Sequence, residues 1–427
     1  MREVSRFAQG VATGIILSAV GFFLAGGVLG PWLQELGGRK EAQMLGLLHE
    51  QLAEDYVVAK DPAWLMRQGV KGMMASLEDP YSYFVGPRHL RAMEEESEGK
   101  LIGIGALVAN GGLIRYPVVD GPAESAGLRP GDTILTVDGD DVRGMPMAEL
   151  LARVKGLPET AVVLSLSRED GSLYETEVIR REVPTGTVAK VALLDPEKGI
   201  GTLHLRSFAR STPSELDAAL AELEAHGPLR GLILDLRFNT GGLLDATIDI
   251  ASRFLDKGRI CSLIGRQGWL QERSADSSLT THPDLPVVVL INSRSASGSE
   301  ILAGALRDGG AAILVGEPSF GKGVYQRVQK YPSGEFAVKF TAGYYLTPSG
   351  KILEGHITSD RVGGLLPDIP APHPDSTRLR SWLIWDPPPD KWLADVQRLF
   401  PGYFQQAPPD PGLASGLEIL RQALSEA

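Results

Sequence analysis

The chain has 427 residues, 43% of them hydrophobic and 22% charged, which is the balance of an ordinary globular protein with about two to four domains. Its 42 Lys and Arg against 53 Asp and Glu give a net charge of -11 without any basic run, which excludes a typical nucleic-acid-binding protein. A single cysteine, Cys261, excludes an intrachain disulfide and a cysteine-rich metal site, and we expect it to be a small buried strand residue.

The N-terminal segment contains an uncharged apolar run. Residues 7–34 carry no charge, and residues 11–29 are mostly apolar or glycine, about the 20 residues that a membrane helix needs. Arg2 and Arg6 precede the run, so the positive-inside rule keeps the N-terminus in the cytoplasm and sends the rest of the chain across the membrane. We favour an uncleaved anchor over residues 1–34. A cleaved signal peptide, with LAGG as its cleavage site, is the alternative, and both predict an exported protein.

The remaining chain divides into four regions. Apolar residues at spacings of three and four predict a helical module over residues 35–98. Short apolar segments separated by glycine and proline predict a compact β-rich domain over residues 99–181. In residues 182–370, continuous apolar strands alternate with helical stretches, which predicts a buried, largely parallel sheet covered by helices. Residues 371–427 are proline-rich with one helix near 413–424, and we interpret them as a surface appendage. The predicted fold class is multidomain α/β.

Four serines lie in SRSASGS, residues 293–299, directly before a helix-patterned run. Ser297-Gly298-Ser299-Glu300 fits the S-x-x-E capping box, in which a serine hydroxyl and a glutamate satisfy free N–H groups at a helix start. Capping alone accounts for this pattern, because helix caps are far commoner than active sites. A catalytic role for one of these serines therefore requires support from the rest of the chain.

A serine nucleophile needs a base, and the usual base is a histidine held by a carboxylate. None of the seven histidines lies in a recognisable triad motif. Lys322 is a better candidate, because it lies between two glycines in VGEPSFGKGVYQ, where the amine can approach a partner closely. Burial lowers the pKa of a lysine from about 10.4 towards neutrality and so allows it to act as a base.

The same segment suggests nucleotide hydrolysis as an alternative. Gly316, Gly321 and Lys322 satisfy the phosphate-loop pattern G-x-x-x-x-G-K, and GLILD at 231–235 resembles an apolar strand that ends in a metal-binding aspartate. The match fails at Gly323, where a phosphate loop needs Ser or Thr to hold magnesium. The two motifs also occur in the reverse of the usual order, so we do not favour this alternative.

LDLRFNTGG, residues 234–242, is a third candidate element. A strand that runs into Asn239, Thr240, Gly241 and Gly242 presents backbone N–H groups on a tight turn, which is how an oxyanion site is built. An ordinary glycine turn between a strand and a helix has the same pattern. The co-occurrence of this turn with the serine and lysine segments favours an active site.

Several ordered motifs together resemble one protein family. SASGSEILAGALRDGG, VGEPSFGKGVYQ, LDLRFNTGG and YYLTPSGKILEG resemble the tail-specific, or carboxyl-terminal processing, proteases, and LEDPYSYF and VVDGPAESAGLRPGDTILTVDG resemble the helical lead-in and the PDZ domain of that family. The resemblance covers roughly residues 45–370 and implies a PDZ domain over 99–181 followed by a mixed α/β protease core of the ClpP/crotonase-like type.

The resemblance also implies roles for individual residues. The nucleophile of the family falls on Ser297 and its general-base lysine on Lys322. Gln326, four residues after Lys322, corresponds to a glutamine that orients the amine, because this spacing keeps both side chains on one face. Asp308 corresponds to an acidic position often associated with the site, although a helix-terminal residue before two glycines explains it equally well.

The expected oxyanion donors are the backbone N–H groups of Gly298 and Gly241. Many relatives have alanine in place of Gly298 and a proline-like residue in place of Thr240. These departures change backbone freedom and leave the donors in place, so they affect the expected rate more than the expected reaction.

The PDZ-like segment predicts how substrates are chosen. Leu101, Ile102, Gly103, Ile104 and Gly105 resemble a carboxylate-binding loop followed by an edge strand. Backbone N–H groups of such a loop hold a C-terminal carboxylate, and the bound peptide adds to the sheet as a further strand. A glycine turn in a β-rich domain is the alternative for this segment.

The resulting hypothesis is an exported, membrane-anchored serine endopeptidase with a Ser-Lys dyad that recognises C-terminal ends of proteins and needs no metal or organic cofactor. The resemblance implies protein or peptide substrates with free C-termini, a homo-oligomer, an activating partner protein, and a bacterial inner-membrane location with the catalytic body in the periplasm or extracytoplasmic space. A catalytically silent PDZ adaptor and, more distantly, a crotonase-like acyl-CoA enzyme are the alternatives.

Overall fold

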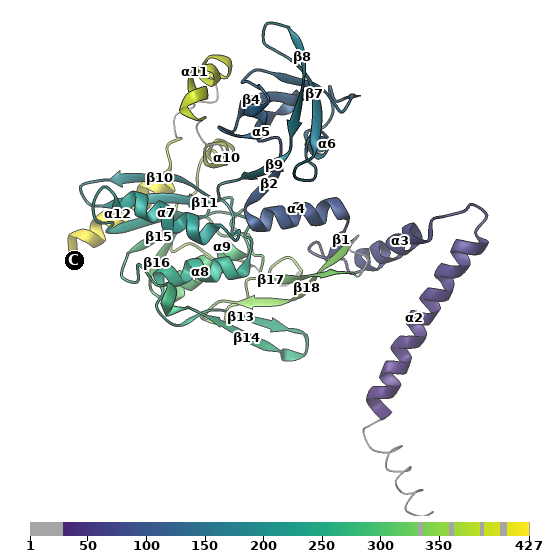
Figure 1. Cartoon of the computed structure of the whole chain (residues 1–427). Coiled ribbons are helices and arrows are strands. Elements are labelled where there is room, and N and C mark those ends of the chain that lie inside the picture. The colour runs from purple at the N-terminus through teal and green to yellow at the C-terminus, as the bar shows by residue number, and fades with distance from the viewer. Residues whose placement is uncertain (1–28, 332–335, 358–362, 385–387, 402–407, 427) are drawn as a thin grey trace, which may run out of the picture. The chain divides into compact units, whose positions relative to one another are not determined.

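The computed structural model describes residues 29–331, 336–357, 363–384, 388–401 and 408–426, and the chain divides into two units, Met1–Glu78 and Asp79–Ala427 (Figure 1). The first unit contributes the helices α2 (Leu29–Asp55) and α3 (Pro62–Ala75). The Asp61 carboxylate caps α3 by accepting the backbone N–H groups of Ala63 and Trp64.

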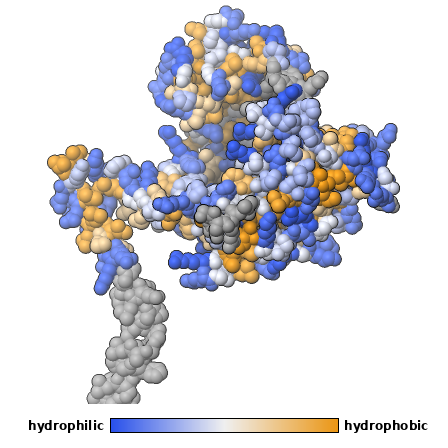
Figure 2. All heavy atoms as spheres, turned by 180° about the vertical axis from the view of Figure 1, so that it is seen from behind, coloured by the Kyte–Doolittle hydropathy of each residue, from blue (hydrophilic) through white to orange (hydrophobic). Residues whose placement is uncertain are grey.

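Many apolar side chains of this first unit are exposed, as Figure 2 shows for both helices; they include Met44, Leu45, Leu47, Leu48, Leu52, Trp64 and Met66. Among the described residues, no helix combines the length and hydropathy that a membrane span requires. Residues 1–28 of the predicted anchor, which spans residues 1–34, lie outside the described residues.

The second unit begins with a short strand, although the sequence pattern predicted only helices up to residue 98. Strand β1 (Tyr83–Val85) precedes helix α4 (Pro87–Glu98) and pairs antiparallel with a strand some 250 residues later, β18 (Ala337–Leu346), so that Val85 lies opposite Ala337. Gly99 ends α4 in the left-handed conformation with φ 73°, as glycine commonly does at a helix end.

The β-rich domain is an antiparallel sheet with strand order β3-β4-β5-β7-β8, in which β6 also pairs with β5. Its strands are β3 (Ala106–Ala109), β4 (Leu113–Pro117), β5 (Thr133–Val137), β6 (Asp140–Asp141), β7 (Ala161–Ser167) and β8 (Leu173–Ile179), and its helices are α5 (Pro122–Ser125) and α6 (Met147–Val154). Ile114, Ile134, Leu164 and Leu166 are fully buried in its core. Strand β3 occupies one edge of this sheet, and the separate pair β2 (Lys100–Gly103) and β9 (Arg181–Pro184) flanks the domain in the sequence.

A six-stranded sheet with order β10-β11-β12-β15-β16-β19 forms the centre of the α/β region. Its strands are β10 (Val188–Asp195), β11 (Ile200–Leu205), β12 (Gly231–Asp235), β15 (Val287–Ile291), β16 (Ala312–Gly316) and β19 (Ile369–Pro370). All of them except β10 run parallel, and every residue of β12 and β15 is buried. The continuous apolar runs had predicted a buried, largely parallel sheet, and these pairings confirm it.

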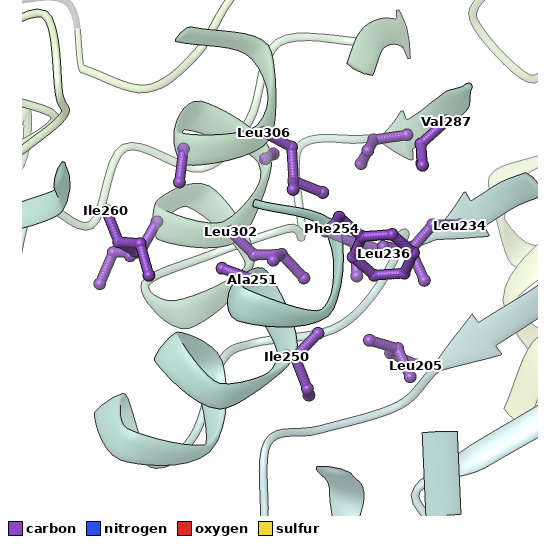
Figure 3. Packing of buried hydrophobic residues seen from close by; sticks show 14 of the residues in the cluster. Leu205, Leu234, Leu236, Ile250, Ala251, Phe254, Ile260, Val287, Leu302 and Leu306 are labelled. Carbon is purple, nitrogen blue, oxygen red and sulfur yellow. The ribbon is translucent and has the colours of Figure 1, made fainter. Parts of the chain in front are cut away.

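Helices cover both faces of this sheet. Helices α7 (Thr212–Glu224), α8 (Leu244–Phe254) and α9 (Gly298–Asp308) contribute to the core on one face. Figure 3 shows this layer, in which Leu234 of β12, Phe254 of α8 and Leu302 of α9 belong to one cluster of buried side chains. On the opposite face, the C-terminal helix α12 (Pro411–Glu426) buries Leu420 against Ile233 and Val288.

A second sheet, with order β1-β18-β13-β14 and with β17 paired to β18, completes this region. Its further strands are β13 (Arg259–Gly265), β14 (Leu270–Ser274) and β17 (Val324–Lys330). Cys261 lies buried in β13, as the sequence predicted, and burial raises the pKa of its thiol to about 11.

The C-terminal region was predicted to be a surface appendage, but its last helix packs in the core. It contains α10 (Ser376–Ile384), α11 (Asp390–Leu399) and α12. An added Cβ at Gly416 of α12 would lie 3.1 Å from Val288 and 3.2 Å from Ile233, so the helix backbone packs closely against the sheet. Because a pattern of apolar residues gives no information about the surface it contacts, the sequence could predict this helix without predicting that it belongs to the core.

Candidate active site

Ser297 lies at the turn between strand β15, which ends at Ile291, and helix α9, which begins at Gly298. Its backbone has φ 58° and ψ -112°, a conformation that residues other than glycine rarely adopt. Such strained residues persist only where the surroundings fix them, and they are concentrated at functional sites. Ser297 is 9% exposed.

Hydrogen bonds from buried polar side chains hold this turn in place. Asn292 Oδ1 accepts the N–H of Arg294 and the N–H of Phe238, both at 3.1 Å. Ser295 Oγ accepts the Asn292 N–H at 3.0 Å and donates to the Leu236 carbonyl at 2.9 Å. Hydrogen bonds therefore hold the turn that contains Ser297 against the segment that follows β12.

Glu300 joins the helix start to the segment that carries Lys322. The predicted capping box forms, with Glu300 Oε2 accepting the Ser297 N–H at 2.8 Å. The same oxygen accepts the Lys322 N–H at 3.0 Å, while Oε1 accepts the Gly321 N–H at 2.7 Å and the Ser319 hydroxyl at 2.6 Å. Burial raises the pKa of Glu300, although these four donors favour its ionised form. A single buried side chain thus connects the backbone of Ser297 with that of Lys322.

The Lys322 side chain is half-buried, and its Nζ lies 5.1 Å from the centre of the Tyr81 ring. Burial lowers the pKa of Lys322, and the Lys339 ammonium lowers it further, while Glu300, Glu354 and Asp79 act in the opposite direction. Burial also raises the pKa of Tyr81 to about 12, so its phenol stays protonated. A lowered pKa is what a lysine needs in order to act as a base.

The turn after β12 packs directly against Ser297. The Asn239 carbonyl accepts the Ala296 N–H at 3.0 Å and the Ser299 hydroxyl at 2.8 Å. Gly241 has φ 102°, and a Cβ added to it would lie only 2.8 Å from Ser297 Cβ. Only glycine allows this approach without a shift of the backbone.

The two expected oxyanion donors differ in their surroundings. In the described part of the chain, no oxygen accepts the Gly298 N–H, as is usual for the first residue of a helix. The Gly241 N–H donates to Asn239 Oδ1 at 2.9 Å. An added Cβ at Gly298 would lie 2.8 Å from Thr247 Oγ1 and 3.1 Å from the Phe208 ring, so the site fits glycine closely.

Gln326 and Asp308, the other two predicted catalytic side chains, form hydrogen bonds with residues other than Ser297 and Lys322. Gln326, in β17, donates from Nε2 to the Val324 carbonyl at 3.3 Å. Asp308 is the last residue of α9, and its Oδ2 accepts the Ser349 N–H at 3.0 Å. With about 1.5 Å of rise per residue, the helix holds Asp308 about 15 Å from its N-terminal end, so the structure does not bring Asp308 to Ser297.

The Lys322 segment does not have the properties of a phosphate-binding loop, the alternative considered from its sequence. The N–H groups of Gly321 and Lys322 both donate to Glu300, and the Gly323 N–H donates to Glu354 Oε2 at 3.1 Å. A phosphate-binding loop directs such N–H groups at its ligand. Carboxylates already occupy these donors, and they would repel a phosphate.

The residues proposed to bind peptides divide between a strand and a loop. Residues 101–103 belong to β2 and pair with β9, while Ile104 and Gly105 lead into the edge strand β3. The Ile104 carbonyl accepts the Ala123 N–H at 2.7 Å, and the Gly105 carbonyl accepts the Val118 N–H at 2.8 Å. Among the described strands, β3 pairs with β4 alone, so it forms an edge of this sheet.

Sequence reasoning missed several residues of this site. Glu300 was interpreted only as a helix cap, and Tyr81 only as part of a family motif. Asn239 was noted for its place in a turn, without its links to Ala296 and Ser299. Their contacts join segments far apart in the chain, and no local pattern records such contacts.

The chain is similar to several known proteins. Residues 199–371 match peptidase family S41, and residues 113–168 match the PDZ domain. The carboxy-terminal processing protease CtpA of Bacillus subtilis (strain 168) is 33% identical over 373 residues, which are 86% of this chain and 78% of that protein. The carboxy-terminal-processing protease of Bartonella bacilliformis is 34% identical over 343 residues, which are 78% of this chain and 76% of that protein. Among solved structures, the photosystem II D1 C-terminal processing protease has 30% identity and a TM-score of 0.46, covering 76% of this chain and 85% of that chain.

The match to peptidase family S41, the match to the PDZ domain and the two bacterial relatives define a serine-type peptidase that carries a PDZ domain. Within that class, the chain belongs to the tail-specific, or carboxyl-terminal processing, protease family.

Proposed function

We propose that this protein hydrolyses peptide bonds with Ser297 as nucleophile and Lys322 as general base. Lys322 takes the hydroxyl proton as Ser297 Oγ attacks the substrate carbonyl, and the resulting ammonium returns a proton to the leaving amine. Water then hydrolyses the acyl-enzyme, with Lys322 again accepting a proton. The observation that carries this proposal is the buried Glu300 carboxylate, whose Oε2 accepts the N–H groups of both residues, at 2.8 Å and 3.0 Å.

The N–H of Gly298 is the stronger candidate for stabilising the oxyanion, because it begins a helix and has no acceptor in the described residues. The Gly241 N–H is the second candidate. It donates to Asn239 Oδ1, so its contribution requires that this bond open or be shared when substrate binds. Gln326 would orient the Lys322 amine after its own amide leaves the Val324 carbonyl. Asp308 is better explained as a residue that holds Ser349.

The PDZ domain is proposed to select substrates by their free C-termini. A peptide adds along the open edge of β3, and the loop that contains Gly103 to Gly105 receives its terminal carboxylate. The names of the two bacterial relatives, both carboxy-terminal processing proteases, support this substrate class. The apolar run at residues 11–29 supports the further proposal of an exported protein anchored in the bacterial inner membrane.

Hydrolysis of casein by the chain without residues 1–34 tests the nucleophile. Ser297→Ala should abolish turnover and leave the fold nearly intact, because loss of a helix cap costs about 0.5 to 2 kcal/mol. The matched control is Ser293→Ala, which changes an exposed serine of the same turn and should retain full activity. Turnover by a folded Ser297→Ala protein would refute the dyad. An inactive wild-type protein that still binds C-terminal peptides would favour the adaptor alternative.

A further inference from the structure

A buried arginine begins the turn that faces Ser297. Arg237 is 4% exposed and contacts two carboxylates. Its Nε and Nη2 donate to Asp235, the latter at 2.6 Å, while Nη1 and Nη2 donate to Asp410 at 2.8 Å and 2.6 Å. Asp235 ends β12 in the same segment, whereas Asp410 comes from the C-terminal region. The C-terminal region thus supplies one of the two counter-charges of this arginine.

Asp410 is also well fixed in its own position. It precedes α12, and its Oδ1 accepts the Leu413 N–H at 3.1 Å while its carbonyl accepts the Ala414 N–H at 2.9 Å, so it caps the helix. Only 11% of its side chain is exposed. An added Cβ at Gly412 would lie 3.4 Å from Arg237 Nη1, which shows how closely the start of α12 packs against the guanidinium.

A continuous series of contacts leads from Arg237 to the proposed nucleophile. The next residue, Phe238, donates its N–H to Asn292 Oδ1 at 3.1 Å. The following carbonyl, that of Asn239, accepts the N–H of Ala296 at 3.0 Å, and Ala296 directly precedes Ser297. A shift of Arg237 would therefore move the Phe238 N–H donor and the Asn239 carbonyl acceptor that hold the Ser297 turn.

We infer that Asp410 is a positioning residue for the active-site turn, so that the C-terminal region completes the active site of this peptidase. This inference rests on the proposed function of Ser297. In the described chain, Asp410 provides the only acceptor for Arg237 Nη1, so removal of its charge leaves a buried guanidinium with an incomplete set of partners. A displacement of about 1 Å in a catalytic arrangement lowers the rate by about a hundredfold.

The experiment must separate positioning from simple helix capping. Asn caps helices as well as Asp does, so Asp410→Asn keeps the cap and removes the charge. The matched control is Asp195→Asn, which removes a second ion pair of α12, between Asp195 Oδ2 and Arg421 Nε at 2.7 Å. Asp195 ends β10, and its side-chain hydrogen bonds within the described residues go to Arg421 and Lys198 and not to the active-site turn. For each variant of the full chain we would measure the Tm, the kcat and KM on a peptide substrate, and the rate at which a fluorophosphonate labels Ser297.

We expect Asp410→Asn to lower both kcat and the labelling rate by about tenfold to a hundredfold with little change in KM. Asp410→Glu should recover part of the loss, and Asp195→Asn should retain kcat whatever it does to the Tm. If Asp410→Asn keeps the kcat of the wild type, or if Asp195→Asn loses as much, the inference is wrong. Ser297→Ala separates this result from a failure of the proposed function: an active Ser297→Ala protein would refute the dyad, whereas an inactive one beside a fully active Asp410→Asn would refute the role of Asp410 alone.

Discussion

Glu300 Oε2 accepts the backbone N–H of Ser297 at 2.8 Å, which places a buried carboxylate directly against the turn of the proposed nucleophile. Each of its two oxygens accepts two donors. In Glu300→Gln the amide N–H₂ would face either the backbone N–H groups of Ser297 and Lys322 or that of Gly321, whereas the Ser319 hydroxyl can turn to accept from it. An unsatisfied buried donor costs about 1–3 kcal/mol.

We therefore expect Glu300→Gln to lower the free energy of unfolding by about 1–3 kcal/mol and to remove most of the activity. Urea denaturation and the kcat of the folded fraction would measure the two effects. Glu222→Gln, at an exposed position of α7, is the control and should change neither. Wild-type kcat in Glu300→Gln would show that the link between Ser297 and Lys322 is unnecessary for catalysis.

The pH dependence of activity tests the base. Burial lowers the pKa of Lys322, so kcat/KM should rise with pH through a single ionisation that lies below the ordinary pKa of lysine. The nearby Lys339 ammonium disfavours a second positive charge. Lys339→Met removes this repulsion, so the pKa of Lys322 should rise and the rising part of the profile should move to higher pH.

Lys322→Arg provides the matching negative control, because a guanidinium does not lose its proton in this range. It should be inactive at every pH. A profile unchanged by Lys339→Met, or an active Lys322→Arg, would point to another base.

Gly241 is the residue whose substitution should disturb Ser297 most directly. Gly241→Ala would place a methyl group 2.8 Å from Ser297 Cβ at φ 102°. Gly258 has a similar φ of 94° and open space around it, so Gly258→Ala measures the backbone strain alone, about 1–3 kcal/mol. We expect a greater loss of stability in Gly241→Ala than in Gly258→Ala, measured by urea denaturation, together with loss of fluorophosphonate labelling. Equal effects of the two variants would argue against the close approach to Ser297.

The selection of free C-termini can be tested with a pair of peptides. A peptide with an apolar free C-terminus should be cleaved faster than its C-terminal amide, because amidation removes the charge that the loop N–H groups receive. Gly105→Ala should abolish this preference, since its Cβ would lie 2.9 Å from Pro122 at φ 66°. Gly111→Ala, with φ 79° and nothing within 4 Å, should keep it. Equal rates for the acid and the amide in the wild type would refute recognition of chain ends by this domain.

The central sheet could be predicted because its strands are apolar on both faces. The runs at 231–235 and 287–291 are continuous, which is typical of parallel strands between helix layers, and in the structure Leu234 pairs with Val289 and Val289 with Leu314. The candidate site was predictable where motif and geometry are local, as at the capping box of Ser297 and Glu300.

Contacts between distant segments could not be predicted in this way. A three-residue strand such as β1 has no recognisable period of its own, and its pairing with β18 depends on the whole fold. Asp410 lies in a proline-rich stretch that is typical of a linker, and its contact with Arg237 spans 173 positions. Glu300 met the requirements of a helix cap, so nothing in its local sequence indicated that it also binds the Lys322 segment.

The backbone angles of Ser297 also have a thermodynamic consequence. At φ 58° and ψ -112° a side chain costs about 1–3 kcal/mol that glycine avoids. Ser297→Gly should therefore be more stable than Ser297→Ala by about 1 kcal/mol, although both lack the hydroxyl. The backbone conformation of Ser297 thus lowers the free energy of unfolding, and the surrounding hydrogen bonds offset this cost. At position 297, catalysis therefore requires serine, whereas stability favours glycine.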